Sequence, residues 1–99
     1  MARSKRSQSS HDSVVRNEAN NLKKQGFSVK ADIPGFPRPH TIRGYRPDID
    51  ASKREQRKIL EVETQDSKDG DRDKAQRKAF RDEANKKEDT TFRRIIANR

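Results

Sequence analysis

The stretch RPDIDASKREQRKILEVET, residues 46–64, decides the predicted fold. Its last eight residues, RKILEVET, alternate as a strand does, so that Leu60 and Val62 point to one face and Glu61 to the other. RPDIDA, at its start, alternates in the same way, and the polar SKREQR between the two blocks is typical of a hairpin loop. We therefore predict two neighbouring strands, at about residues 41–51 and 58–64, joined by a hairpin.

Four further segments with regular spacing flank this stretch. An apolar stripe at helical spacing, with Ser10 as the N-cap and Gly26 after its last residue, predicts the first helix. FSVKADI alternates strictly and predicts a strand, and the proline-rich PGFPRPH after it predicts an irregular loop. The segments are a helix at about residues 10–24, a strand at 27–33, a helix at 72–87 and a strand at 90–97. The prediction is an α/β fold in the order helix–strand–strand–strand–helix–strand, with a mixed four-stranded sheet and one helix on each face or both near one face.

Composition limits both the core of this fold and the partners of the chain. Only 26% of the 99 residues are hydrophobic and 41% are charged, so a single domain over residues 10–99 has a thin core. Residues 1–9 are basic and serine-rich, and we expect a flexible arm there. The absence of cysteine excludes disulfides and thiolate sites, and no apolar run is long enough for a membrane span, so a cytoplasmic location is expected. The net charge of +9 favours DNA or another polyanion as the partner.

Three acidic residues are predicted to meet inside this fold. A hairpin centred on residues 54–55 places Asp48 directly opposite Glu61, and like charges at such positions destabilise a sheet unless a cation lies between them. Glu18 shares the helical spacing of the apolar residues around it, so we expect it to face the core. Because carboxylate oxygens suit Mg²⁺ or Mn²⁺, the three acids together predict a metal site. Taken singly, each of them is more typical of a solvated outer face.

These residues resemble the motif of the PD-(D/E)xK nuclease superfamily, and most of all that of its archaeal Holliday-junction-resolvase-like members. The match consists of Pro47-Asp48 and, after a hairpin, Glu61-Val62-Glu63, in the element order of the superfamily core. The resemblance implies a small restriction-endonuclease-like core and a metal-dependent endonuclease that hydrolyses DNA phosphodiester bonds, with a preference for junctions or branched DNA. It also implies Mg²⁺ or Mn²⁺ as the cofactor.

The same resemblance assigns roles to individual residues. The implied metal ligands are Asp48, Glu61, the Val62 carbonyl and Glu18, and the implied catalytic residues are Glu18, Asp48, Glu61, Glu63 and Gln76. The sequence departs from the motif at position 63, where Glu replaces the Lys that is thought to orient or deprotonate the attacking water. Lys74 and Lys78, which flank Gln76 on the second helix, are candidates for a displaced lysine, with a solvated helix face as the simpler interpretation.

The basic residues nearest the acidic motif are the first candidates for nucleic-acid contacts. His11 and His40 have no partner at a spacing typical of a metal site or a catalytic base, so neither is assigned such a role.

A homodimer is expected, because two sites are needed to cut a junction symmetrically and a thin core gains from a subunit interface. Two alternatives stay open: a DNA-binding module that kept the fold without the chemistry, and a disordered basic chaperone or packaging protein. The predicted nucleic-acid contacts are Arg38, His40, Arg43, Arg46, Lys53, Arg54, Arg57, Lys74 and Lys78.

Overall fold

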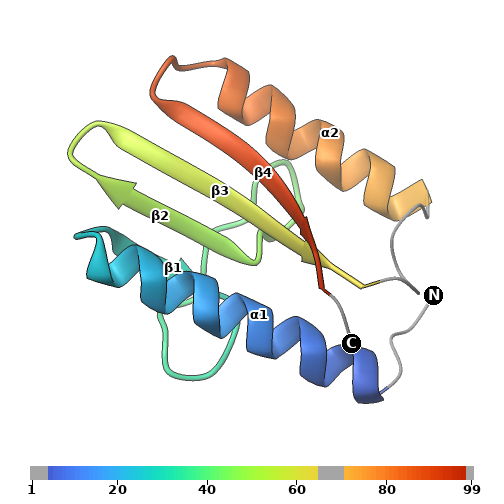
Figure 1. Ribbon diagram of the computed structural model, residues 1–99. Helices are drawn as coiled ribbons and strands as arrows, with labels where there is room; N and C mark the ends of the chain where they lie inside the picture. The colour runs from blue at the N-terminus through green and yellow to red at the C-terminus, as the bar shows by residue number, and fades with distance from the viewer. Residues whose placement is uncertain (1–4, 65–70, 98–99) are drawn as a thin grey trace.

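The protein forms a four-stranded sheet with two helices, as a computed structural model that describes residues 5–64 and 71–97 shows (Figure 1). The predicted element order and the α/β class are confirmed. The elements are α1 (Lys5–Lys24), β1 (Ser28–Ala31), β2 (Ile49–Lys53), β3 (Gln56–Glu63), α2 (Asp71–Asn85) and β4 (Thr90–Ile96).

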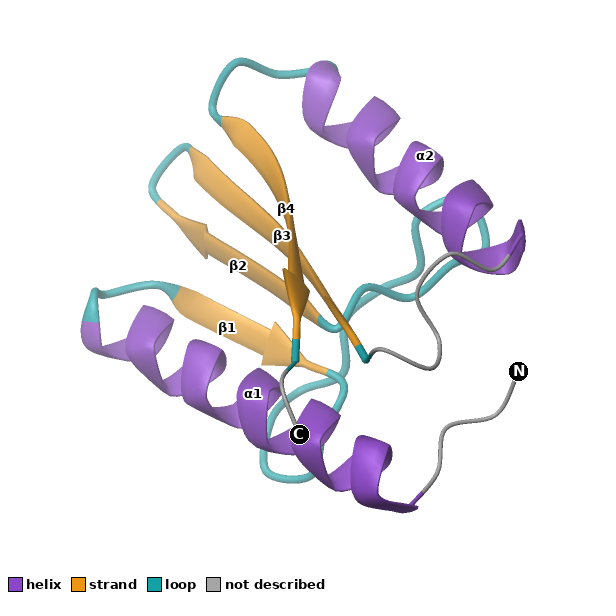
Figure 2. Ribbon diagram, turned by 45° about the vertical axis from the view of Figure 1, so that its right-hand side comes forward, coloured by secondary structure: helices purple, strands orange, loops and turns teal. Residues whose placement is uncertain are grey.

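The sheet is mixed, with the strand order β1-β2-β3-β4. β1 and β2 pair antiparallel, as do β2 and β3, whereas β3 and β4 pair parallel. A parallel pair needs a crossover connection, and α2 supplies it. Figure 2 shows the sheet between the two helices, with α1 on one face and α2 on the other. Of the two predicted arrangements of the helices, the structure therefore has one helix on each face.

α1 is longer than predicted. It begins at Lys5 rather than Ser10, and Gln8 Nε2 donates a hydrogen bond to Asp12 Oδ1 at 2.8 Å, one turn later. The prediction of a flexible arm over residues 1–9 is therefore wrong from Lys5 onward, and residues 1–4 lie outside the described residues. Within residues 5–64 and 71–97, neither helix has the length and apolar character of a membrane span.

The end of α1 is set by Gly26, as predicted. The Gly26 N–H donates to the carbonyl of Lys23 and the Phe27 N–H to the carbonyl of Leu22, each at 3.0 Å. This is a Schellman motif, which needs a residue of positive φ at the position of Gly26, and its φ is 96°. Phe27 and Leu22 then meet in the core, so the motif also aims the chain into β1.

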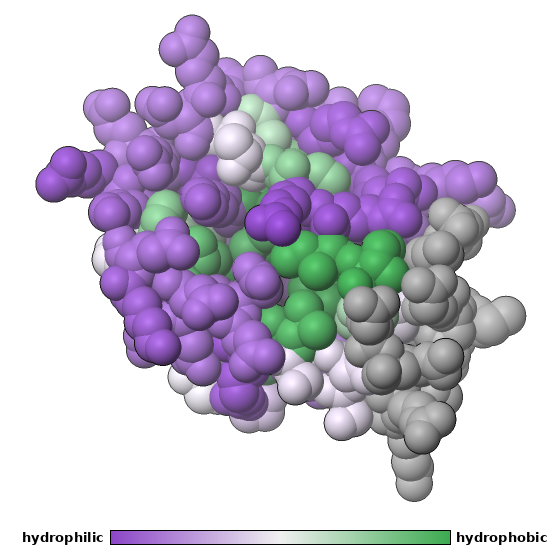
Figure 3. Space-filling model, viewed as in Figure 1, coloured by the Kyte–Doolittle hydropathy of each residue, from purple (hydrophilic) through white to green (hydrophobic). Residues whose placement is uncertain are grey.

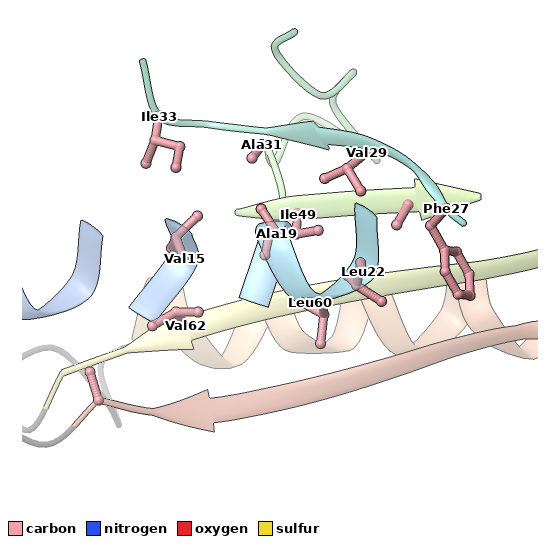
Figure 4. Close-up of a cluster of buried hydrophobic side chains, with 12 residues drawn as sticks. Val15, Ala19, Leu22, Phe27, Val29, Ala31, Ile33, Ile49, Leu60 and Val62 are labelled. Atoms are coloured by element: carbon pink, nitrogen blue, oxygen red, sulfur yellow. The ribbon is translucent and has the colours of Figure 1, made fainter. Parts of the chain in front are cut away.

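The larger core lies between α1 and the sheet. Val15, Ala19 and Leu22 project from α1 onto the side chains of Leu60 and Val62 in β3 (Figure 4). The apolar side of the predicted strand FSVKADI completes this core. The members from that strand are Phe27, Val29, Ala31 and Ile33, all buried.

A smaller core lies on the other face of the sheet, under α2. Phe80 is fully buried against Ile59 and Ile42, and its ring centroid lies 5.8 Å from that of Phe92. The alternation within β3 therefore serves both layers, since Leu60 packs under α1 and Ile59 under α2. This phase also decides which face receives the acidic side chains of β3.

The β2–β3 hairpin has the predicted register but different bounds. Ile49 pairs with Leu60, so continuing the register places Asp48 opposite Glu61, as predicted. The ladder runs through to Lys53 and Gln56, however, and leaves a two-residue turn in place of the predicted six-residue loop. Arg54 takes the positive φ, 55°, that this tight turn requires.

The prediction of a strand over residues 41–48 is wrong. These residues form a loop in which Ile42 and Tyr45 make an isolated bridge around a tight turn. Arg43 and Gly44 have positive φ values of 53° and 86°, which interrupts any extended strand. Pro47, just before β2, has no N–H to donate to a ladder.

Candidate metal centre

Three carboxylates gather on the α2 face of the sheet. One carboxylate oxygen from each of Glu61, Glu63 and Asp73 lies within 4.8 Å of the others, a spacing that can hold a metal ion. Glu61 and Glu63 are buried, and Asp73 is nearly so. We call these three residues the acidic group.

The local sequence explains how each member reaches this place. Glu61 and Glu63 are two residues apart on β3, so they point to the face that carries Ile59 and lies under α2. Asp73 belongs to the first turn of α2, where the helix dipole and the free N–H groups stabilise a negative charge. The crossover from β3 to β4 thus carries the third acid back over the end of β3.

Three side chains that are either neutral or positively charged contact the acidic group. Gln76, one turn after Asp73, donates its Nε2 to Glu61 Oε2. Arg94 of β4 places Nε 2.5 Å from Glu63 Oε2, and Arg77 places Nε 3.4 Å from an oxygen of Asp73. Within the described residues, guanidiniums therefore lie against two of the three carboxylates, and the third, Glu61, accepts the hydrogen bond of Gln76.

Glu63 is the least satisfied member of the acidic group. Its side chain is only 2% exposed, yet neither carboxylate oxygen accepts a hydrogen bond from any residue that the structure describes. The contact with Arg94 is close, but it is an ion pair without hydrogen-bond alignment. A buried carboxylate normally has hydrogen-bond partners, because its desolvation is otherwise costly. The unfilled acceptor positions of Glu63 are therefore available to a cation.

Asp48 has both carboxylate oxygens engaged and is not one of the three residues of the acidic group. Its Oδ2 accepts the backbone N–H of Val62 at 2.8 Å, and its Oδ1 lies 3.0 Å from Nε2 of the buried His11. The other ring nitrogen of His11 lies 2.9 Å from Asp12 Oδ1. Since a neutral imidazole has a single N–H, both contacts are hydrogen bonds only when His11 is protonated. The charge of Asp48 is thus balanced by α1 and by the backbone of β3.

The structure does not bring Glu18 to the acidic group. The buried stripe of α1 runs through His11, Val15 and Ala19, and Glu18 lies about 60° around the helix from Val15 at its centre. Glu18 instead lines a groove of about 360 Å³ on the α1 face of the sheet, together with Lys58 and Arg93. The prediction that Glu18 faces the core is therefore wrong, and the sheet separates it from Glu61.

The Pro-rich loop and the loop before β2 hold four of the predicted nucleic-acid contacts. Arg43 pairs with Asp82 of α2 at 3.4 Å, and Arg46 donates to the carbonyl of Pro39. Arg38 makes a long pair of 3.7 Å with Asp32 and is mostly exposed, and His40 is exposed. Arg38 and His40 are therefore open to a ligand, whereas Arg43 and Arg46 also hold the loop in place.

The hairpin holds three more of these contacts, at the far end of β3. Arg54 is exposed in the turn, and Lys53 donates to the carbonyl of Gln25 at 2.7 Å. Arg57 bridges Asp50 at 2.7 Å and Glu83 at 3.2 Å. The hydrogen bond to Asp50, reinforced by Glu83, raises the pKa of Arg57 against the opposing effect of burial. At about 3.3 Å per strand residue, the turn lies roughly 25 Å from the acidic group.

The two lysines of α2 point away from the acidic group. Lys78 pairs with Asp82 at 2.9 Å on the exposed side of the helix, and Lys74 is exposed. Within residues 5–64 and 71–97, the side chains of Arg94 and Arg77 form ion pairs with the acidic group and those of the two lysines do not, so neither lysine takes the place of the one absent at position 63.

Three residues of this region were not predicted from the sequence. His11 carried no spacing signal, although the spacing of His11, Val15 and Ala19 along one helix face is visible in the sequence. Asp73 stands as one acid among many in a charged helix. Arg94 has no local signal, because its place beside Glu61 depends on the register of the parallel pair.

Comparison with known proteins identifies no relative of this chain: no family model, no curated protein and no solved structure matches it.

Proposed function

We propose that the chain is a metal-dependent endonuclease that acts on DNA and holds its metal at the acidic group. The observation that supports this most is the meeting of three largely buried carboxylates, Glu61, Glu63 and Asp73, in a protein of net charge +9. A basic protein attracts the phosphate backbone, whereas a buried negative site attracts a cation.

The donor set fits a hard divalent cation. The acidic group offers only carboxylate oxygens, which favour Mg²⁺, Mn²⁺ or Ca²⁺ over Zn²⁺. Glu63 has acceptor positions free of hydrogen bonds within the described residues. A bound divalent ion supplies Lewis-acid stabilisation of a phosphate oxygen and makes a bound water more acidic.

The residues of the chain have separate tasks in this proposal. Gln76 fixes the orientation of Glu61 by its hydrogen bond. Asp48, held by His11 and by the Val62 N–H just before β2, would be a further candidate ligand in this proposal. The Val62 carbonyl remains a proposed further ligand, since the register places it opposite Pro47, which has no N–H to donate. Glu18 has no role in the proposed metal site.

A cleavage assay tests this function directly. Labelled duplex, single-stranded, nicked, flap and four-way-junction DNA are each incubated with Mg²⁺, with Mn²⁺ and with EDTA. We expect cleavage that needs the metal and that Glu61→Gln reduces by at least a hundredfold. Glu88→Gln is the matched control, because it makes the same change at an exposed residue. The absence of cleavage from all five substrates with both metals would contradict the proposal.

A second function has support from one observation. The ion pairs of Arg94 with Glu63 and of Arg77 with Asp73 stabilise the acidic group without a metal, as in a DNA-binding module that lacks catalysis. That module binds DNA equally well in EDTA, and Glu61→Gln leaves its affinity unchanged or raises it by removing negative charge. Measurement of DNA affinity for the two proteins, with and without metal, separates it from the nuclease.

A homodimer is part of the proposal for junction DNA, because symmetrical cleavage needs two sites. Light scattering of the free protein and of its complex with a four-way junction measures the number of copies. A single copy on the junction contradicts this part alone.

A further inference from the structure

Arg94 is held at the acidic group by one edge of its guanidinium. It pairs laterally with Glu61 in the parallel register of β3 and β4, and its Nε lies against Glu63 Oε2. Glu63 is buried, whereas the Arg94 side chain is 26% exposed. The side chain therefore extends from a buried carboxylate to the surface.

Arg94 pairs with Glu63 alone among residues 5–64 and 71–97, and the contact is made by Nε. A guanidinium presents its N–H groups as a planar fork that matches two oxygens of a phosphate. Because Arg94 is paired with the buried Glu63 through Nε, the range of orientations of that fork is restricted before a ligand arrives, which reduces the entropy lost on binding.

We propose that Arg94 binds a DNA phosphate at the acidic group through its Nη groups. This inference rests on the proposed function in one respect, because it takes the phosphate of the substrate to be the ligand. Position 63 carries a glutamate and therefore offers no positive charge to a phosphate. Arg94 supplies that charge from the neighbouring strand β4. Lys74 and Lys78 have no such place, since neither contacts the acidic group.

Arg93 gives a matched comparison on the opposite face of the sheet. Successive residues of a strand point to opposite faces, and Arg93 lines the groove between α1 and β4 together with Lys58 and Lys24. In Figure 3 this side of the molecule carries a small apolar area between α1 and β4, framed by hydrophilic side chains. Replacement of either arginine removes one positive charge, but Arg93 is exposed on the opposite face of the sheet whereas Arg94 pairs with the buried Glu63.

The experiment measures how DNA affinity depends on salt for the wild type, Arg94→Gln, Arg94→Lys and Arg93→Gln. A short labelled duplex is titrated with each protein in Ca²⁺, and a gel confirms that the duplex stays intact. Each phosphate contact contributes about 0.9 to the slope of log K against log salt. We expect Arg94→Gln to reduce the slope by about 0.9, and Arg94→Lys and Arg93→Gln to keep it.

Loss of Arg94 also leaves Glu63 without its counter-charge, so the fold of the single variant needs protection. Glu63→Gln with Arg94→Gln removes both charges of the pair, and it is compared with Glu63→Gln alone. The same drop in slope between these two proteins supports the inference. An unchanged slope without Arg94, or a drop with Arg93→Gln that is equal or larger, overturns it. Failure of the wild type to cleave DNA contradicts the nuclease and leaves the slopes as the test of Arg94.

Discussion

Metal binding at the acidic group can be read from the thermal stability of a single variant, Glu63→Gln. The change removes one of the three charged ligands and keeps the shape of the side chain. At an effective dielectric constant of about 20, each carboxylate repulsion on Glu63 costs about 3.5 kcal/mol at 4.8 Å, whereas the attraction of Arg94 at 2.5 Å contributes about 6.5 kcal/mol. These effects nearly cancel. We therefore expect the metal-free stability of the variant to stay within about 2 kcal/mol of the wild type.

The response to metal differs much more between the two proteins. At a metal concentration of about 100 times the dissociation constant, binding stabilises the wild type by about 2.7 kcal/mol. For a domain of this size, that stabilisation raises the midpoint temperature of thermal unfolding by roughly 10–20 °C. A site weakened about a hundredfold gains only about 0.4 kcal/mol at the same concentration, or roughly 2–3 °C.

Thermal unfolding followed by circular dichroism, with increasing Mn²⁺ or Mg²⁺, gives both midpoints. Glu88→Gln, the control for an exposed glutamate, should respond as the wild type does. Equal metal-induced shifts in the wild type and in Glu63→Gln would refute the assignment of Glu63 as a ligand. No shift in the wild type would refute the metal site as a whole.

Three further predictions concern the fold around the site. Phe80→Ala removes the central ring of the smaller core and should cost about 3–5 kcal/mol in urea unfolding, so a cost below about 1 kcal/mol contradicts the packing described. Arg57→Gln breaks the charged hydrogen bonds to Asp50 and should cost about 1.5–3 kcal/mol in the same unfolding measurement. The hydrogen bond from Lys78 lowers the pKa of Asp82 below its usual 3.8, so this carboxylate adds stability above that pH and loses it as the pH falls below. Asp82→Asn should therefore flatten the acid limb of stability against pH, and an unchanged limb counts against the pair.

The sheet could be predicted in detail because its strands carry strict alternation. The register of Ile49 with Leu60 followed from centring the hairpin on residues 54–55, and the order of the elements followed from their separate periodicities. The loop over residues 41–48 could not be predicted as readily. Its positive φ at Arg43 is not a residue preference, and it is imposed by the bridge between Ile42 and Tyr45.

The site was less accessible to prediction, and the phase of α1 shows why. Val14 and Val15 are neighbours, so the apolar pattern leaves the centre of the buried face uncertain by one residue, or about 100°. If the buried face of α1 is centred on Val14 and Glu18, the glutamate points inward. In the structure the buried face is centred on Val15, and His11 is buried. A polar residue at the end of an apolar stripe has no hydrophobic signal of its own.

The parallel pairing of β3 and β4 gives the candidate site a place in the order of folding. The β1–β2–β3 meander is built from local antiparallel pairs, whereas Asp73 and Arg94 arrive only when the crossover through α2 closes. Opening of α2 and β4 alone would therefore dismantle the site while the meander is still folded. A ligand that joins Glu61 to Asp73 opposes that opening, so hydrogen exchange in β4 should slow when the ligand binds, more than exchange in β1 does.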